Sequence, residues 1–370
     1  MASTLNQAQR PPQIGDEQIQ LLEQLCNACA VSGDEGEVRT IVQEQVRPHL
    51  RDGDDLKIDA LGNILVTRKG QAQDRLRVML AAHMDEVGFM LSNDEKDGIF
   101  RFETVGGLDA RQLAGKPVWV GKDHLPGVIG AKPVHLTKSD ERRKTISLDE
   151  LRIDVGPDNG SKVKVGDRAT FATSFSRLGP SIRAKALDDR LGVCTLIELV
   201  KHAPPNVDLL AAFTVQEEIG LRGAQVAAYS LDPQLAIVLD STPAYDLPVL
   251  DADGDWAQEN TRYNTRLGYG PAVYIADRAT LSDPRLVRHL VASAESTGIP
   301  LQFRQPGGGG TDAGVIHKQR AGIPSVSVSV PARYLHTAAG IARLSDWQNT
   351  LALVYTALTT LTPDLLAVER

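Results

Sequence analysis

Acidic residues and histidines follow the apolar segments of this sequence at several separate places. Where such segments form neighbouring strands of an open α/β sheet, the side chains beyond their carboxyl ends converge on one edge. Imidazole and carboxylate are the ligand types that hold zinc, cobalt or manganese, and a carboxylate can also act as a general base. The pattern therefore predicts a metal-dependent active site. Its candidate residues are His83, Asp85, Asp188, Glu217, Glu218, Asp240 and His336.

The adjacent residues Glu217 and Glu218 need two separate roles. Successive side chains of an extended segment point to opposite sides. One carboxylate can then bind a metal while the other faces the substrate as a base. The same divergence argues against a glycosidase, whose two catalytic carboxylates flank one sugar bond roughly 5–9 Å apart.

Other metal-type residues lack this context. Cys26 and Cys29 form a CxxC pair, but no second ligand pair at similar spacing completes a zinc knuckle. Residues 16–30 have helical periodicity, so we interpret the two cysteines as small residues on one helical face. We assign no function to the remaining histidines, which are His49, His124, His135, His202, His289 and His317.

Alternating strands and helices must position the candidate residues. The predicted strands are residues 63–68, 75–82, 207–215, 235–239, 301–303 and 325–330. The predicted helices are residues 16–30, 34–50 with Asp34 as a cap, 187–201, 222–229, 284–297, 311–318 and 346–361. This alternation predicts an α/β fold, with a mixed, mostly parallel sheet covered by helices.

The segment 89–179 has a different character. Short β-like runs are separated by glycine and proline, and long helical patterns are missing. We therefore expect a small β-barrel-like insert at 89–179, within a catalytic domain made of residues 1–88 and 180–370. Such an insert exposes strand edges, which are usually covered or paired, so we expect a homo-oligomer.

The composition excludes several classes of protein. The 370 residues carry a net charge of −7, with 42% hydrophobic and 24% charged residues, as in an ordinary globular protein. The acidic balance argues against nucleic acid or a membrane as a partner. Residues 1–15 are polar and lack the pattern of a signal peptide, so we expect a cytoplasmic protein.

Six motifs, in matching order, give the sequence a resemblance to a known family. They lie at residues 82–89, 185–190, 215–220, 239–240, 308–314 and 331–336. Together they resemble the dinuclear aminopeptidases of metallopeptidase family forty-two, which include glutamyl, deblocking and tetrahedral (TET) aminopeptidases. The resemblance covers nearly the whole chain. It implies a zinc-exopeptidase-like fold with an inserted all-β dimerisation domain.

The resemblance also implies roles for single residues. Two divalent metal ions would be bridged by Asp188, with zinc expected and cobalt or manganese as alternatives. Glu218 and His336 would complete one metal site, and His83 and Asp240 the other. Glu217 would be the catalytic base and Asp85 would orient His83. Thr311 and Asp312, in the glycine-rich segment 308–314, would face the substrate or support the site; a tight glycine turn is the alternative.

The function implied by the resemblance is aminopeptidase activity on short peptides with free N-termini. A water activated by two metals would attack the peptide bond, with Glu217 accepting its proton. The alternatives are a related metal amidase, deacylase or dipeptidase, and a non-enzymatic assembly protein. The resemblance implies dimers that assemble further, up to a tetrahedral dodecamer. Departures from the family at residues 245–269 and 337–340 leave the preferred N-terminal residue open.

Overall fold

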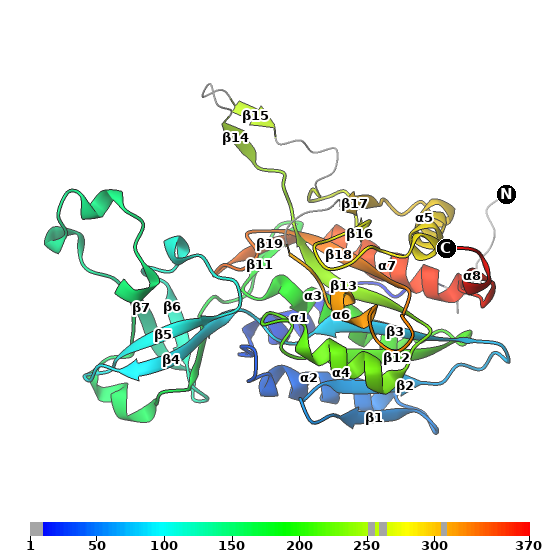
Figure 1. Cartoon of the computed structure of the whole chain (residues 1–370), viewed down its shortest axis with the longest axis horizontal. Helices are drawn as coiled ribbons and strands as arrows, with labels where there is room; N and C mark the ends of the chain where they lie inside the picture. Colours follow the sequence, from blue (N-terminus) through cyan, green and yellow to red (C-terminus); the bar gives the residue numbers. More distant parts are fainter. Residues whose placement is uncertain (1–9, 251–255, 259–264, 305–308) are drawn as a thin grey trace.

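The computed structural model describes residues 10–250, 256–258, 265–304 and 309–370. An α/β part lies beside a smaller β-barrel, and the strand pair β14 (Pro248–Leu250) and β15 (Trp256–Gln258) projects from the α/β part (Figure 1). Gly308 of the glycine-rich motif and part of the segment 245–269 lie outside the described residues. No helix among the described residues is long and apolar enough to cross a membrane.

The main sheet has eleven strands, and its centre is parallel. The central strands, in spatial order, are β12 (Val207–Thr214), β3 (Leu76–His83), β13 (Leu235–Pro243) and β18 (Ser325–Arg333). The flanking strands are β1 (Asp55–Ile58) and β2 (Ile64–Arg68) on one side, and β19 (Gly340–Arg343), β11 (Ser181–Ala184), β10 (Ser176–Leu178), β16 (Ala272–Tyr274) and β17 (Gln302–Arg304) on the other.

Helices cover both faces of this sheet. In β3, Val78, Leu80 and Ala82 pack into a large cluster on one face, whereas Met79 and Ala81 pack into a smaller cluster on the other. The helices of the large cluster are α1 (Asp16–Asn27), α2 (Gly36–Val46), α3 (Leu187–Lys201), α5 (Pro284–Thr297) and α7 (Leu344–Thr360), joined by the short α8 (Asp364–Ala367). Those of the smaller cluster are α4 (Arg222–Leu231) and α6 (Ala313–Ile316).

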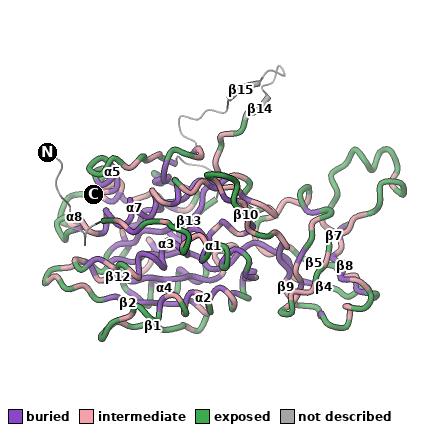
Figure 2. Tube along the Cα trace, turned by 180° about the vertical axis from the view of Figure 1, so that it is seen from behind, coloured by how far each residue is buried: buried purple, intermediate pink, exposed green. Residues whose placement is uncertain are grey.

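Burial on both faces explains why the central strands are continuously apolar in the sequence. Figure 2 shows the buried segments concentrated in this part of the molecule. The predicted fold, a mixed α/β sheet covered by helices, is confirmed.

The insert forms a closed barrel, which confirms the predicted all-β module. Its strands, in spatial order, are β4 (Gly88–Asp94), β5 (Ile99–Val105), β8 (Arg152–Asp154), β7 (Leu125–Gly130), β6 (Pro117–Val120) and β9 (Arg168–Phe171). Phe89 packs edge-to-face on Phe102 and Phe171, with ring centroids 5.1 and 5.3 Å apart. The strand β10, within the segment predicted as insert, pairs with β11 in the main sheet.

A buried ion network joins the barrel to the α/β part. The Glu86 carboxylate accepts hydrogen bonds from Lys185 Nζ at 2.8 Å, from the Ala30 amide at 3.0 Å and from the Thr170 hydroxyl at 2.9 Å. Thr170 belongs to barrel strand β9, whereas Lys185 and Ala30 belong to the α/β part. This one carboxylate therefore ties barrel strand β9 to the α/β part.

Two local predictions were wrong at the start of the chain. Helix α1 ends at Asn27, and Ala28 is extended (φ −64°, ψ 148°), so Cys29 lies outside the helix. The Cys29 and Ala30 amides donate to the carboxylates of Glu37 and Glu86, which replace helical acceptors. Asp34 does not cap α2; the capping position is Glu35, which makes no side-chain cap hydrogen bond.

Candidate metal centre

The candidate residues meet at the carboxyl edge of the parallel strands. His83 is the last residue of β3, and Asp240 lies in β13. Glu217 and Glu218 follow β12, and His336 follows β18. Asp188 enters the same edge from the start of α3. Parallel pairing of β12, β3, β13 and β18 is what brings these distant parts of the sequence together.

Asp188 lies between the two histidines. Its Oδ1 atom is 3.1 Å from His83 Nε2, and its Oδ2 atom is 3.4 Å from His336 Nε2. Glu218 Oε2 is 3.3 Å from His336 Nε2, and Asp240 Oδ1 is 3.9 Å from His83 Nε2. The Nε2 atom of each imidazole therefore faces Asp188 and one further carboxylate.

Asp85 supports three of these residues from behind. Its backbone oxygen lies 3.2 Å from His83 Nδ1, and its carboxylate lies 3.5 Å from the same nitrogen. The carboxylate also accepts the backbone N–H groups of Glu217 at 3.0 Å and Glu218 at 3.2 Å, and the hydroxyl of Ser32 at 2.6 Å. Asp85 thus fixes both the ring of His83 and the loop that carries the two glutamates.

The two glutamates do not lie on an extended strand, contrary to the prediction. Gln216 has a positive φ of 55°, which turns the chain beyond β12, and both Glu217 and Glu218 line the same cavity. The alternation of strand side chains therefore does not separate them, and that argument against a glycosidase loses its premise.

Thr311 and Asp312 are buried beneath the glycine-rich loop. Thr311 Oγ1 lies 2.7 Å from Ser327 Oγ, and Asp312 Oδ2 accepts a hydrogen bond from Thr214 Oγ1 at 2.6 Å. The cavity wall at this place is formed by Gly309 and Gly310 instead. The loop is thus attached to strands β18 and β12 through the two side chains.

Burial and mutual repulsion shift the pKa values of the clustered carboxyls. Burial raises the pKa of Glu217 well above its usual range and that of Glu218 to about 7. Burial would also raise the pKa of Asp188, but hydrogen bonds from His336 and His83 lower it. For His336, burial favours the neutral ring, yet the hydrogen bond to Asp188 raises its pKa to about 10. The cluster alone therefore retains protons at neutral pH.

The residues present fit divalent cations. Among the described residues, the buried oxygens Glu218 Oε1, Asp189 Oδ2 and Asp312 Oδ1 have no hydrogen-bond partner. The nearby cationic groups of Lys185 and Arg190 are already paired with Glu86. Burying carboxylates without compensating charge is costly, and bound cations would supply that charge. Two groups bring their ligand atoms within 4.8 Å of one another: His83 with Asp188 and Glu218, and His83 with Asp189 and Asp240.

Asp189 was not among the predicted residues. It is fully buried and belongs to one of these two groups, beside His83 and Asp240. Its position next to Asp188 was the available signal in the sequence. Adjacent acidic residues at the start of a helix are common, however, so that signal is weak.

The barrel also contributes to the centre. The carbonyl oxygen of Gly107 lies 2.9 Å from His336 Nδ1, where it can accept a hydrogen bond. In the neutral ring, that bond places the proton on Nδ1 and leaves Nε2 to face Asp188 and Glu218. A backbone carbonyl in a distant segment has no signature in the sequence, so this contact could not be predicted.

A cavity of about 910 Å³ opens over the cluster. This volume suits a small peptide. Three basic residues that sequence reasoning missed line its wall, namely Arg278, Arg304 and Lys318. Arg304 is held in place by a hydrogen bond to Thr242 Oγ1 at 2.7 Å, with its guanidinium 4.9 Å from the centre of the Tyr274 ring.

Comparison with known sequences identifies related proteins. Residues 62–353 match the model of the M42 glutamyl aminopeptidase family. The glutamyl aminopeptidase of Lactococcus lactis subsp. cremoris is 32% identical over 349 residues, covering 90% of this chain and 94% of the relative. The lysyl aminopeptidase of Pyrococcus furiosus is 31% identical over 356 residues, covering 93% and 97%.

Comparison with solved structures finds the same architecture. A TET aminopeptidase from the marine sediment archaeon Thaumarchaeota archaeon SCGC AB-539-E09 has a TM-score of 0.87 at 33% identity, covering 95% of this chain and 99% of its own. The TET1 peptidase of Pyrococcus horikoshii, which can assemble into a tetrahedron or a large octahedral shell, has a TM-score of 0.79 at 32% identity. That match covers 93% of this chain and all of the other.

Proposed function

The chain belongs to the M42 glutamyl aminopeptidase family, and on this premise we propose that it is a metal-dependent aminopeptidase that releases N-terminal residues from short peptides. The observation that carries the proposal is the position of Asp188, with one carboxylate oxygen toward each histidine. A carboxylate in that position can bridge two cations.

The proposed ligands form two sets around Asp188. Glu218 and His336 would hold one divalent cation, and His83 and Asp240 the other, with Asp189 within reach of the second set. Imidazole and carboxylate ligands suit zinc, and they also accept cobalt or manganese. When bound, such cations lower the pKa of a water molecule and polarise the scissile carbonyl.

Glu217 is the proposed general base. It lines the cavity, and the hydrogen bond from its amide to Asp85 holds its backbone. Burial raises the pKa of its carboxyl well above the usual range. Cations bound beside it would favour the ionised form, in which this carboxylate could take a proton from water and then deliver it to the leaving amine.

The charge of the cavity wall supports a preference for acidic N-terminal residues. With bound cations offsetting the carboxylates of the centre, the side chains of Arg278, Arg304 and Lys318 would attract a substrate carboxylate and repel an ammonium group. By this argument the chain shares the preference named in its glutamyl relative rather than that of its lysyl relative.

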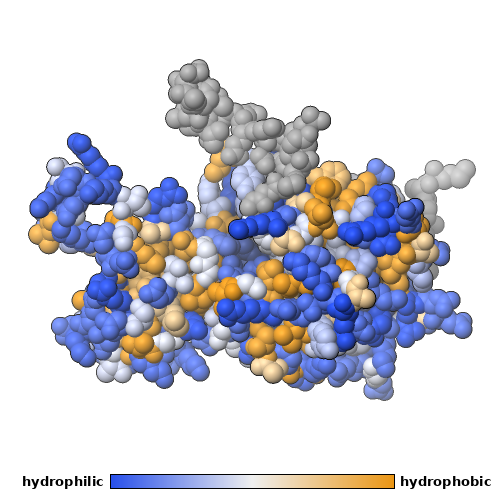
Figure 3. Space-filling model, in the orientation of Figure 1, coloured by the Kyte–Doolittle hydropathy of each residue, from blue (hydrophilic) through white to orange (hydrophobic). Residues whose placement is uncertain are grey.

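We also propose that the protein is a homo-oligomer assembled through its barrel. Between β7 and β8 the chain makes an exposed excursion that carries Val134, Leu136 and Ile146 (Figure 2). Figure 3 shows apolar patches among hydrophilic side chains on the body of the barrel, whereas the outer end of the excursion is mostly hydrophilic. The shells formed by the TET1 peptidase of Pyrococcus horikoshii support assembly beyond a dimer.

The metal-reconstituted protein, assayed on a panel of amino-acid anilides, dipeptides and longer peptides, tests the proposed activity. We expect metal-dependent hydrolysis of anilides with a free α-amine, fastest for glutamyl and aspartyl anilides, and none of their N-acetylated forms. Equal hydrolysis of acetylated substrates would instead indicate an amidase or deacylase. Cleavage of dipeptides alone would indicate a dipeptidase. Full metal loading without any hydrolysis would support an assembly protein.

A further inference from the structure

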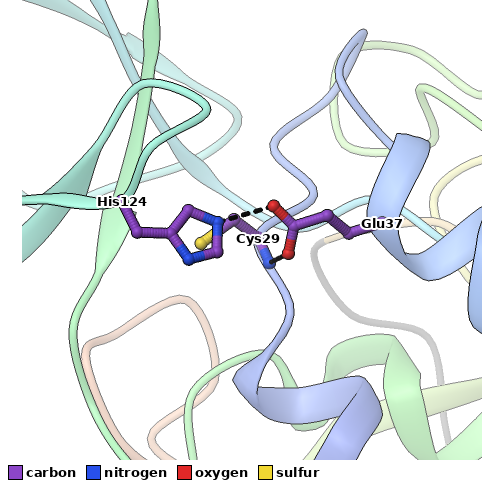
Figure 4. Close-up of side chains that lie close together, drawn as sticks. All are labelled: Cys29, Glu37 and His124. Carbon is purple, nitrogen blue, oxygen red and sulfur yellow. Dashed lines mark hydrogen bonds and ion pairs between the residues drawn. The ribbon is translucent and has the colours of Figure 1, made fainter.

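A second group of metal-type ligands lies where the barrel meets the α/β part. It consists of Cys29, Glu37 and His124, which we name the junction cluster (Figure 4). Cys29 follows helix α1, Glu37 lies in the first turn of α2, and His124 ends the turn between barrel strands β6 and β7. One ligand atom of each residue lies within 4.8 Å of the other two. None of the three belongs to the centre around Asp188.

Hydrogen bonds already orient the junction cluster. Glu37 Oε1 lies 2.6 Å from His124 Nε2, and Glu37 Oε2 accepts the backbone N–H of Cys29 at 2.9 Å. His124 has a positive φ of 50°, a conformation that a residue other than glycine adopts only at some cost. The three side chains point toward one another from three separate segments (Figure 4).

We propose that the junction cluster binds one divalent cation of the zinc class through Cys29 Sγ, a Glu37 oxygen and His124 Nε2. Thiolate, imidazole and carboxylate together are the ligand set that zinc favours, and a water can supply the fourth position. Zinc would hold its ligand atoms about 3.3–3.8 Å apart. For a cation to bind, the Glu37–His124 hydrogen bond must therefore break, and Cys29 Sγ must move closer to the other two ligand atoms. Both side chains can move, since 40% of Glu37 and 37% of His124 is exposed.

The surroundings of the junction cluster suit a cation better than they suit a reactive thiol. A cavity of about 300 Å³ adjoins Cys29 and Glu37, and its wall includes Asp34 together with the basic residues Lys122 and Arg168. With the thiol protonated, the carboxylates of Asp34 and Glu37 balance the two positive charges, and loss of the thiol proton on cation binding would leave a negative charge for the cation to offset. Burial raises the pKa of the Cys29 thiol to about 12, which argues against a nucleophilic or redox-active cysteine.

A cation at this place would fix the orientation of the barrel. The junction cluster joins both parts of the molecule, as does the contact between Gly107 of the barrel and His336 of the metal centre. Holding the barrel therefore also holds a carbonyl that orients a proposed metal ligand. The cation would act as a positioning element, outside the chemistry.

Cobalt titration of the full-length protein tests the proposal by absorption spectroscopy. The proposed ligands around Asp188 include no sulfur, so a thiolate-to-cobalt charge-transfer band reports the junction cluster alone. We expect the band to grow with about one equivalent of Co²⁺, separate from the equivalents bound at the centre. Cys29→Ala should abolish it, and His124→Asn should weaken the cobalt binding that it reports at least tenfold.

His135→Asn is the matched control, because His135 is an exposed histidine of the same barrel that lies outside the cluster, between β7 and β8. It should leave the band unchanged. If Cys29→Ala does not fold, His124→Asn provides the test instead, because His124 is half-exposed. Absence of the band at saturating Co²⁺, or its persistence in folded Cys29→Ala, would overturn the proposal. Peptidase activity is measured in a separate assay, so neither result of the cobalt titration tests the proposed function.

Discussion

The carboxylates of the metal centre differ in which side chains they face. Glu218 faces His336, and Asp188 faces both histidines. In the described part of the chain, Glu217 makes no hydrogen bond or ion pair with either imidazole, although it lines the same cavity. This difference separates the proposed ligands from the proposed base.

Replacement of Glu217 by glutamine should remove catalysis and leave the metals in place. A positioned acid–base group contributes about 10²–10⁴-fold to the rate, so kcat should fall by at least that factor. Glu218→Gln, the control at the neighbouring position, should lower the metal content instead. Steady-state kinetics and elemental analysis of both variants check the assignment. Near-normal turnover of Glu217→Gln would refute it.

Metal binding at the centre should strengthen as the pH rises. A cation must displace protons from the cluster, where the pKa of Glu218 is about 7 and that of His336 about 10. Protonated ligands do not coordinate, so affinity should fall roughly tenfold per pH unit below 7 for each displaced proton. Calorimetry in buffers of different ionisation enthalpy counts the protons released. An affinity independent of pH between 5 and 8 would contradict this account.

The loop that follows barrel strand β5 completes the wall of the metal centre. Gly106 has a positive φ of 86°, and a Cβ added there would lie 2.8 Å from Val87 Cγ1 and 3.3 Å from Glu218 Cβ. The next residue, Gly107, supplies the carbonyl that faces His336. Glycine is needed at 106 both for the backbone conformation and for the close approach of this loop to Glu218.

Gly106→Ala should therefore lower metal affinity and kcat. Gly115→Ala is the matched control, because Gly115 also has a positive φ, 77°, but nothing lies within 4 Å of its added Cβ. Each variant should lose about 1–3 kcal/mol of stability through backbone strain. Only Gly106→Ala should impair the centre. Thermal unfolding and metal titration of the two proteins distinguish these effects, and equal metal affinities would contradict the proposed role of the loop.

The sequence predicted elements where local pattern decides the structure. Strands buried on both faces are continuously apolar in the sequence, so the central strands could be predicted. The polar residues that follow these apolar runs then placed His83 and Asp240 at one edge of the sheet. Cys29 was misplaced because distant carboxylates, Glu37 and Glu86, compete for the backbone amides after α1. The contact between His336 and Gly107 joins residues far apart in sequence, and no local pattern encodes it.

The barrel projects from the α/β part (Figure 1). It carries exposed apolar side chains. Val134 is 65% exposed and Leu136 is 63% exposed. Side chains of this kind, on an excursion outside the barrel core, suit a contact with a second copy of the chain. Assembly through this surface would restrict access to the cavity and select short peptides.

Leu136→Asp should weaken assembly without unfolding the protein, because the side chain is already exposed. Light scattering should give a mass several times the 40.0 kDa of one chain for the unmodified protein, and a smaller mass for the variant. Leu61→Asp, an exposed leucine in the turn between β1 and β2, is the control and should leave the mass unchanged. A mass of one chain for the unmodified protein at all concentrations would rule out the oligomer.

The strand order of the main sheet has a consequence for the protein during its synthesis. The centre draws on β3, β12, β13 and β18, and the ligand candidates run from His83 to His336. A nascent chain on the ribosome lacks His336 until β18 has been translated and has paired with β13. Until then the centre has only one of its two imidazoles. On the proposed assignment of ligands, a growing chain would therefore gain peptidase activity only after the residues from His83 to His336 have been translated.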